Sequence, residues 1–359
     1  MSNSMLDRSH IAWRGAPLAL ASALLFGASV PLAKPLLNEL GPWLLAGLLY
    51  LGSGLGLAAL ELFRRLFRGR SPEAPLRRAD LKWLALATVS GGLVGPVLLM
   101  TGLAVTKAST AALLLNLEGL ATMAIAWIVF RENVDRRLLI GAFAILAGAI
   151  LLSWQAGAAG FGFGALAIAG ACVAWGIDNN LTRKISGSSP VQIAMVKGLV
   201  AGTVNVAISF WIGAKPVSWA ILGAAGSIGF LGYGVSLVLF VLGLRHLGGT
   251  ARTSAYFSTA SFMGAAIAIA MFHEPLTAQL LIAALLMGVG VYFHLTEVHQ
   301  HEHTHDALKH EHRHVHDEHH QHSHATDDPK GEPHTHWHRH PPLTHAHPHY
   351  PDLHHRHRH

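Results

Sequence analysis

Long apolar segments fill the chain from residue 16 to residue 295 and constrain its fold more than any other feature. A helix needs about 20 apolar residues to cross the hydrocarbon core of a bilayer. Membrane β-barrels instead alternate apolar and polar positions, which excludes them for unbroken apolar runs such as residues 146–152. The sequence therefore predicts an all-α membrane protein with ten transmembrane helices. They are expected at residues 16–37, 42–63, 82–104, 108–130, 137–155, 162–182, 190–213, 217–243, 249–272 and 277–295.

The distribution of cations predicts the orientation of these helices. Lys and Arg are concentrated in the cytoplasmic loops of membrane proteins. If the N-terminus is cytoplasmic, the arginine-rich segments 64–78 and 131–137 face the cytoplasm, and the outer segments hold only Lys107 and Lys215. We therefore expect a multi-pass protein of the cell inner (plasma) membrane, with both the N-terminus and the C-terminus in the cytoplasm.

A motif in the first half of the apolar region recurs in the second half. Three matched pairs share a spacing of 142 residues: Phe130 with Phe272, Glu132 with Glu274, and Gly148 with Gly290. Because each half holds an odd number of predicted helices, the halves insert upside down relative to one another, as in many secondary transporters. Lys34 aligns with Arg183, and the predicted topology places these cations near opposite membrane faces. The sequence thus predicts inverted five-helix repeats at 16–155 and 162–295, followed by a tail at 299–359.

Charge, cysteine content and motifs exclude several classes of protein. The net charge is +6, but most cations in residues 1–296 border predicted spans, where membrane insertion and anionic lipid headgroups explain them. We therefore expect the lipid bilayer as a partner and no nucleic acid. The single cysteine, Cys172, excludes a disulfide framework within the chain. The sequence contains no GxxxxGK[ST] loop, so we expect neither ATP hydrolysis nor another enzyme activity.

An acidic residue inside a predicted helix is the first candidate functional group. Glu118 lies near the middle of the fourth span, where a charge costs at least about 2.5–3.5 kcal/mol. Such a carboxylate can couple transport to protons or bind a cationic substrate. It can also serve the structure alone, as a protonated group bonded to Asn116 or to a neighbouring helix.

A second polar cluster lies in the inner half of the sixth span and contains Asp178, Asn179 and Asn180. Lys197 lies about two helical turns into the seventh span from the same side. An Asp178–Lys197 ion pair and direct substrate binding are both compatible with this spacing. Two further residues belong to the predicted substrate pathway: Trp175, which either lines a cavity or packs in the core, and Lys34, near the outer end of the first span.

Other residues have simpler predicted roles. Small residues spaced four apart allow helix backbones to approach closely in lipid. This spacing occurs at Gly52 with Gly56, Gly91 with Gly95, and Gly198 with Gly202. Glu132 and Glu274 lie at span ends, where helix capping or an interaction with the helix dipole explains them.

Three motifs relate the chain to a known family. They are Phe26-Gly27-Ala28 in the first span, Leu117-Glu118-Gly119 in the fourth span, and the Phe-x-Glu boundary at Phe130/Glu132 and Phe272/Glu274. With these motifs, residues 16–295 resemble the drug/metabolite transporter superfamily of the EamA type. The resemblance implies secondary transport of small molecules by alternating access. The chain departs from the family in two places: Gly119 stands where a proline is usual, and Thr259-Ala260-Ser261 replaces the acidic residue in the second repeat.

The tail from residue 299 holds 23 of the 27 histidines. Most of them alternate with other residues, and residues two apart project to one side of an extended chain, so neighbouring imidazoles can converge on one ion. Imidazole suits Zn²⁺, Ni²⁺ and Co²⁺. The tail contains few large apolar residues, so we also expect it to be disordered and cytoplasmic. The candidate metal ligands are His299, His301, His303, His305, His310, His312, His314, His316, His334, His336, His338, His340, His345, His347 and His349.

Three functions compete at this point. In the first, the bundle exports a small organic metabolite by secondary active transport, no cofactor is required, and the tail binds divalent transition metals as a buffer or regulator. In the second, the chain transports Zn, Ni or Co, and the tail collects the ion. In the third, the chain is a membrane-anchored metal sensor or store that transports nothing. The first is preferred because the bundle lacks a dense set of Asp, Glu and His residues. A homodimer is left open.

Overall fold

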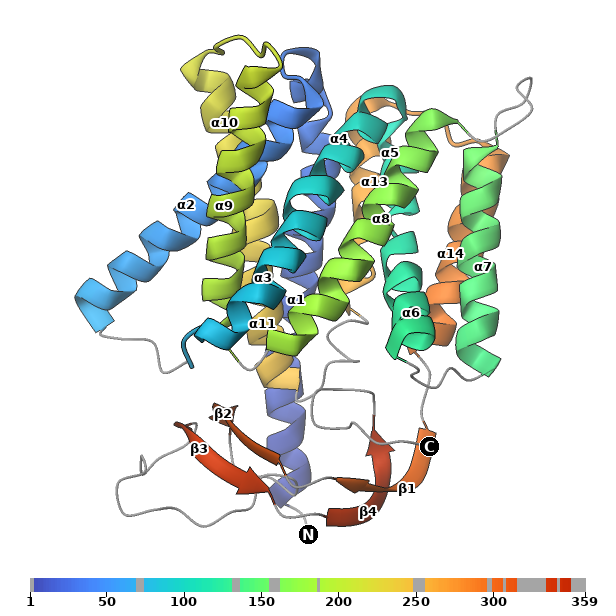
Figure 1. The fold of residues 1–359 in the computed structure, drawn as a ribbon. Helices are drawn as coiled ribbons and strands as arrows, with labels where there is room; N and C mark the ends of the chain where they lie inside the picture. Colours follow the sequence, from blue (N-terminus) through green and yellow to red (C-terminus); the bar gives the residue numbers. More distant parts are fainter. Residues whose placement is uncertain are drawn as a thin grey trace.

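The computed structural model describes residues 3–68, 74–130, 136–154, 162–185, 188–247, 256–295, 299–305, 308–314, 334–340 and 343–349 (Figure 1). The helical segments of the first half are α1 (Asn3–Ala33), η1 (Pro35–Asn38), α2 (Pro42–Arg68), η2 (Arg78–Asp80), α3 (Leu81–Ala87), η3 (Thr88–Val94), α4 (Gly95–Val105), α5 (Ala108–Leu114), α6 (Leu117–Phe130) and α7 (Arg136–Ser153). Those of the second half are α8 (Phe163–Thr182), η4 (Arg183–Ile185), α9 (Pro190–Trp211), α10 (Trp219–Gly229), η5 (Phe230–Val235), α11 (Ser236–Leu247), α13 (Ala260–Phe272) and α14 (Ala278–Leu295).

Within the described residues, seven helices are long and apolar enough to cross a membrane. Helix α13 is apolar but shorter, and α14 has a shorter apolar part. Helix α8 has 20 residues, but Asp178, Asn179 and Asn180 lower its mean hydropathy. The chain is thus a multi-pass α-helical membrane protein. Its helices fall on the segments that the sequence predicts, although α1 begins earlier, at Asn3.

Two spans contain a π-helical segment at matching positions. Segment η3 begins at Thr88 and η5 begins at Phe230, which gives the 142-residue spacing of the sequence motif again. Each segment holds two glycines. Turns also interrupt two other spans, at residues 115–116 between α5 and α6 and at residues 258–259 before α13. Such interruptions of the regular helix ladder are frequent at functional sites and in the discontinuous helices of transporters.

Helices of the first half pack mainly against helices of the second half. The pairs include α2 with α9, α7 with α14, α1 with α11 and α13, and α4 with α8. The glycine pairs expected at close helix contacts lie there. At all six positions an added Cβ would come closer than 3.0 Å to another helix; on Gly52, for example, it would lie 2.2 Å from the carbonyl oxygen of Gly226. The predicted role of these glycines is therefore confirmed.

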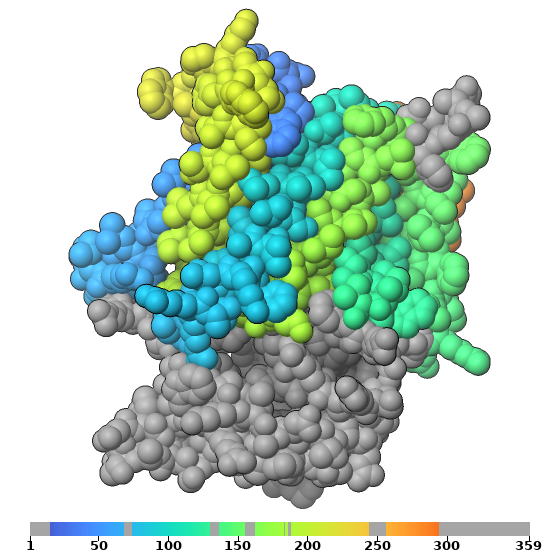
Figure 2. Space-filling view, in the orientation of Figure 1, coloured from blue at the N-terminus to red at the C-terminus, as the bar shows by residue number. Residues whose placement is uncertain are grey.

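Large apolar side chains also cover the outside of the bundle. Phe67, Ile128, Phe143, Trp211 and Leu285 are each at least two-thirds exposed. Figure 2 shows one outer face of the bundle, on which α6 lies between α8 and α7, and α2, α9 and α3 lie on the other side of α8. Lipid tails cover such a surface without the cost that water would impose.

The described part of the tail contains β1 (His299–His305), β2 (Leu308–His314), β3 (His334–His340) and β4 (Leu343–His349). Strand β1 pairs antiparallel with β4, and β2 pairs antiparallel with β3. The sequence predicts disorder for the tail, whereas the structure pairs these segments as strands. Antiparallel pairing gives their backbone N–H and C=O groups hydrogen-bond partners other than water. The strands lie at the same end of the bundle as the start of α1 (Figure 1).

Candidate functional site

A buried ion pair connects α8 with α9. The Nζ of Lys197 lies 2.6 Å from Oδ1 and 2.5 Å from Oδ2 of Asp178. Thr182 Oγ1 donates to the same Oδ1 at 2.9 Å. The side chain of Lys197 is 14% exposed and that of Asp178 is 7% exposed, so water solvates neither charge well. The predicted ion pair is thus present in the structure, and it is stable there because each charge has the other as its counter-ion.

The π-helical segment η3 lies directly against this pair. An added Cβ on Gly91 would lie 1.9 Å from Asp178 Oδ2, so only glycine allows the carboxylate to stand at that position. The carbonyl oxygen of Gly91 accepts two hydrogen bonds, from Tyr50 Oη at 2.8 Å and from Trp175 Nε1 at 2.9 Å. Trp175 is buried against Gly95. Trp175 therefore packs in the core, which is one of its two predicted roles. It also lies against the same π-helical segment as Asp178.

Glu118 lies in the first turn of α6, directly after the turn that separates α5 from α6. Its Oε1 accepts from Asn179 Nδ2 at 3.0 Å, and Asn179 Nδ2 also donates to Thr122 Oγ1 at 3.2 Å. The expected partner on a neighbouring helix is therefore Asn179. The alternative partner, Asn116, donates instead to the carbonyl oxygen of Leu113.

Asn180 has a different role from its neighbour Asn179. Its Nδ2 donates to the carbonyl oxygens of Thr122 at 3.0 Å and Gly176 at 2.8 Å. Asn180 is buried and joins α6 to α8, whereas Asn179 is exposed. Of the two amides, only Asn179 bonds to the carboxylate of Glu118.

A chain of aromatic rings continues from the ion pair into the second half of the molecule. Tyr50 contacts Tyr233 at a centroid distance of 5.6 Å, and Tyr233 contacts Phe26 at 5.7 Å. Phe26 in turn contacts Phe257 at 5.3 Å. Charged, amide and aromatic side chains from both halves therefore meet in one region inside the bundle.

Lys34 does not join this cluster. Its Nζ donates to the backbone carbonyls of Leu103, Ala104 and Thr106, at the C-terminus of α4. Glu274 binds the N-terminus of α5 rather than the helix that follows it in the chain. Its predicted capping role is thus confirmed, although the capped helix lies in the other half of the molecule. Glu132 lies outside the described residues.

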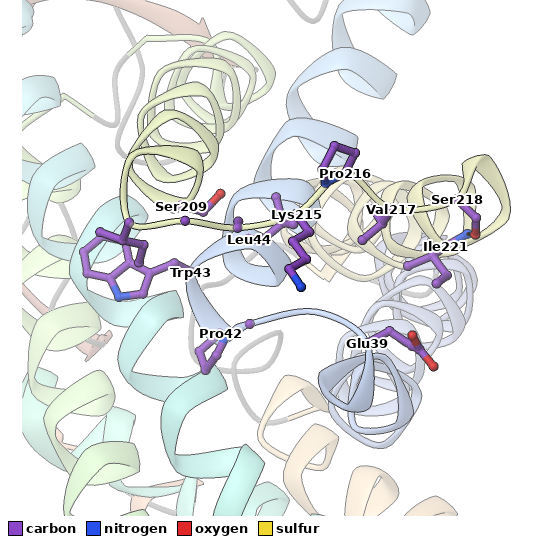
Figure 3. A pocket seen from close by; sticks show the side chains of 14 residues that line it. Glu39, Pro42, Trp43, Leu44, Ser209, Lys215, Pro216, Val217, Ser218 and Ile221 are labelled. Atoms are coloured by element: carbon purple, nitrogen blue, oxygen red, sulfur yellow. Dashed lines mark hydrogen bonds between the residues drawn. The ribbon is translucent and has the colours of Figure 1, made fainter.

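A hollow of about 840 Å³ opens at the end of the bundle opposite the tail strands. It lies between the start of α2 and the α9–α10 connection, and most of its lining is apolar (Figure 3). Two charged side chains of opposite sign line it, Glu39 and Lys215. In the predicted topology this hollow faces outward.

Sequence reasoning missed Tyr50, Thr122 and Thr182 in the central site, and it gave Gly91 a role in helix packing alone. Tyr50 is 41 residues away from its acceptor Gly91, and no spacing rule links a tyrosine to a carbonyl in another helix. The pair Gly91-Gly92 and the polar Ser90 before it were the available signal for a distorted helix. Asn205 was also missed: it is fully buried, its Nδ2 donates to the carbonyl oxygen of Gly92 at 3.2 Å, and its Oδ1 has no hydrogen-bond partner among the described residues.

The side chains of the candidate metal ligands in the tail lie outside those that the structure describes. Within the described side chains, no group of three or more His, Cys, Asp or Glu residues is placed to hold a metal ion. For the tail, the structure gives strand pairing and register.

Comparisons with known proteins agree with this architecture. A model of the EamA-like transporter family matches residues 13–154 and, a second time, residues 162–296. An uncharacterized transporter of Methanothermobacter thermautotrophicus is 25% identical over 287 residues, which cover 76% of this chain and 83% of that protein. The uncharacterized transporter YyaM of Bacillus subtilis is 24% identical over 285 residues, which cover 76% of this chain and 91% of that protein.

A solved structure, described as "Crystal structure of protein", superimposes with a TM-score of 0.58 at 20% identity. The superimposed region covers 77% of this chain and 94% of the chain in the solved structure. At this identity the likeness supports the fold alone. The family match ends at residue 296 and so leaves out the histidine-rich tail.

Proposed function

We propose that this chain, which belongs to the EamA-like transporter family, is a secondary active transporter that exports a small organic metabolite across the cell inner membrane. Transport proceeds by alternating access between two inverted five-helix repeats, and both termini are cytoplasmic. No cofactor is required. Family members are transporters of small molecules, and the proposal adds the direction, the repeat organisation and the site.

Two features support the inverted repeats. The family model matches each half separately. The π-helical segments and the interrupted spans recur at a spacing of 142 or 143 residues, since η3 and η5 begin at Thr88 and Phe230, and α6 and α13 begin at Leu117 and Ala260. Inverted repeats with discontinuous helices place the substrate site between the repeats, near the middle of the membrane.

The Asp178–Lys197 ion pair beside Glu118 is the observation that carries the proposal. A buried ion pair between transmembrane helices is costly, and such groups mark transport pathways. A solute with its own ionised groups can serve as the counter-ion of Asp178 or Lys197 in place of the other residue. The neighbouring aromatic rings can bind its apolar part. We therefore propose a solute that carries both charged and apolar groups, with Glu118 as the proton-coupling carboxylate.

The test is solute flux into proteoliposomes that contain the full-length chain. The panel holds amino acids, other small organic ions, and zinc, nickel and cobalt, each measured with and without an imposed proton gradient. We expect one organic class to accumulate with wild-type protein. Glu118→Gln should retain gradient-free exchange but lose proton-driven accumulation. Proton-driven accumulation at the wild-type rate by Glu118→Gln contradicts the coupling role, and flux of metals alone favours a metal transporter.

We also propose that the tail binds Zn²⁺, Ni²⁺ or Co²⁺ and regulates the bundle. The strand register supports this, because histidine stands opposite histidine at three alternate positions of the first strand pair: His299–His349, His301–His347 and His303–His345. The second pair of strands repeats this pattern with His310–His338, His312–His336 and His314–His334. Opposed residues in an antiparallel pair have Cβ atoms about 4.5–5.5 Å apart, which suits two imidazoles on one ion.

Comparison of the full-length chain with a form that ends at Leu295 tests the tail. Zinc binding by equilibrium dialysis should fall to the background level in the shortened form. Organic solute flux should lose its zinc dependence but continue. If the shortened form also stops moving a metal that the full-length chain moves, metal is cargo and the tail delivers it.

A further inference from the structure

The short connection between α4 and α5 is held by charges from distant parts of the chain. Helix α4 ends at Val105 and α5 begins at Ala108. Lys34, just after α1, donates to Ala104 O at 3.1 Å, to Thr106 O at 2.9 Å and to Leu103 O. A cation at this position binds carbonyls that have no partner within their own helix, and it interacts favourably with the helix dipole.

On the other side of this connection, Glu274 binds the start of α5. Its Oε1 accepts from the backbone N–H of Ala108 at 2.9 Å, and its Oε2 accepts from the backbone N–H of Ser109 at 3.2 Å and from the Ser109 hydroxyl. Helix α5 has no cap from its own preceding residue, Lys107. The first half thus supplies the cation, and the second half supplies the anion.

The backbone that carries Glu274 is strained. His273 has φ 52°, the left-handed conformation, and it is the one non-glycine residue with positive φ among those described. Such a conformation is unfavourable for a non-glycine residue and persists where surrounding contacts impose it. It turns the chain at the end of α13, so that Glu274 follows directly and reaches α5.

Helix α5 connects this contact to the central site. It has seven residues, and the turn at residues 115–116 separates it from α6, whose first turn holds Glu118. It packs against α1 and α13, the helices that end just before Lys34 and Glu274. A hollow of about 520 Å³, lined by both charged residues, lies beside the connection. Helix α5 can therefore tilt toward open space when Glu274 releases its N-terminus and Lys34 releases the end of α4 before it.

We propose that Lys34 and Glu274 form an outer latch, which holds α5 closed over the central site and must break for the pathway to open outward. The inference rests on the proposed transport function. It adds the residues that control access from the outer face and a lever, α5, that connects them to Glu118. The same two charges recur in the sequence as Arg183 and Glu132, which the proposed topology places at the inner face.

The native cysteine provides a reporter for this movement. Cys172 is fully buried, it is the single cysteine of the chain, and its Sγ lies 3.6 Å from the carbonyl oxygen of Leu114, the last residue of α5. The experiment measures labelling of Cys172 by a membrane-impermeant maleimide, applied to the outer face of vesicles that contain the full-length protein. No solute is needed.

We expect slow labelling in the wild type and labelling that is about tenfold faster or more in Lys34→Gln and Glu274→Gln, because each loses charge-assisted hydrogen bonds of the closed state. Lys107→Gln, which removes an exposed cation from the same connection, is the matched control and should label like the wild type. Glu274→Asp should label at an intermediate rate.

Unfolding is distinguished from opening by reagent applied to the inner face. A latch variant should label faster from outside only, whereas an unfolded one labels faster from both sides. Wild-type rates in both Lys34→Gln and Glu274→Gln overturn the latch, and proton-driven solute flux then still supports the transport proposal. Faster outer labelling without flux of any solute retains the latch and refutes the proposed transport.

Discussion

The two π-helical segments share a backbone form but differ in the chemistry around them. Segment η3 packs against α8, and η5 packs against α1, so each contacts the first helix of the opposite half. An added Cβ on Gly91 would meet the carboxylate of Asp178, whereas one on Gly232 would meet the Cβ of Ser29 at 2.6 Å. Asp178 and Ser29 occupy equivalent positions when Lys34 is aligned with Arg183.

This difference distinguishes the repeated backbone structure from the side chains of the candidate site. Ser29 is uncharged and donates to the carbonyl oxygen of Phe26 in its own helix, so α1 needs no counter-ion at this position. When the same alignment is extended to α2 and α9, Leu48 stands at the position of Lys197. The backbone distortions therefore recur in both halves, as rocking between similar repeats requires, whereas the Asp178–Lys197 ion pair occurs in the second half only.

The largest effect is expected where one partner of the ion pair is removed. Lys197→Leu leaves Asp178 buried without its counter-ion, which should destabilise the protein by about 3–5 kcal/mol and abolish solute flux. The measurements are denaturant unfolding of the purified protein in detergent and flux in proteoliposomes.

A double variant controls for the charge. Asp178→Ser with Lys197→Leu gives the second half the residues that the first half has at Ser29 and Leu48. It should regain most of the lost stability and still transport nothing. Normal flux in the double variant would show that the asymmetry between the halves has no part in transport.

The second effect compares the two glycines. Gly91→Ala and Gly232→Ala each place a methyl group too close to a neighbour and should each cost about 1–3 kcal/mol of stability. Gly91→Ala also displaces the carboxylate of Asp178 from Lys197, so flux per folded molecule should fall strongly in this variant alone. Gly223→Ala is the control, because an added Cβ there meets nothing within 4 Å. Equal flux in the two glycine variants would contradict the comparison.

Sequence reasoning anticipated a multi-pass helical membrane protein, the glycine contacts and, as one of two alternatives, the Asp178–Lys197 ion pair. Apolar length and composition reveal membrane helices, and charges two turns from the same membrane face must find partners. The partner of Glu118 was anticipated only as a group on a neighbouring helix, because the rotation of α8 that selects Asn179 follows from packing.

Contacts to the backbone were not predictable in the same way. The acceptors of Lys34 are carbonyls at a helix end 69 to 72 residues away, and every residue carries such a group. For that reason the sequence assigned Lys34 to the substrate pathway, and the structure places it at the α4–α5 connection. The strand register of the tail was not predictable for a similar reason. Histidines recur so often there that many registers would place histidine opposite histidine.

The third effect separates two adjacent amides that α1 lacks, since Val30 and Pro31 occupy the equivalent positions. Asn179→Ala should leave stability unchanged within about 0.5 kcal/mol, because Asn179 is exposed, but it should lower proton-driven flux by removing the donor to Glu118. Asn180→Ala should cost about 1–3 kcal/mol of stability, because two buried carbonyls lose their shared donor, with a smaller effect on flux per folded molecule. A large loss of stability in Asn179→Ala with a large loss of flux in Asn180→Ala would contradict the roles given to these two residues.

The smallest effect concerns the shared acceptor in η3. Tyr50→Phe keeps the ring contact with Tyr233 and removes one of the two hydrogen bonds to the carbonyl oxygen of Gly91, so it should cost only about 0.5–1.5 kcal/mol while Trp175 still donates. In a Trp175→Phe background the same substitution leaves a buried carbonyl without a donor, and its cost should be larger than in the wild type. A double-mutant cycle by denaturant unfolding measures this coupling. Additive costs would mean that the Gly91 carbonyl finds another donor, and the π-helical segment would then be held by packing alone, as the glycine and serine contacts suggest for η5.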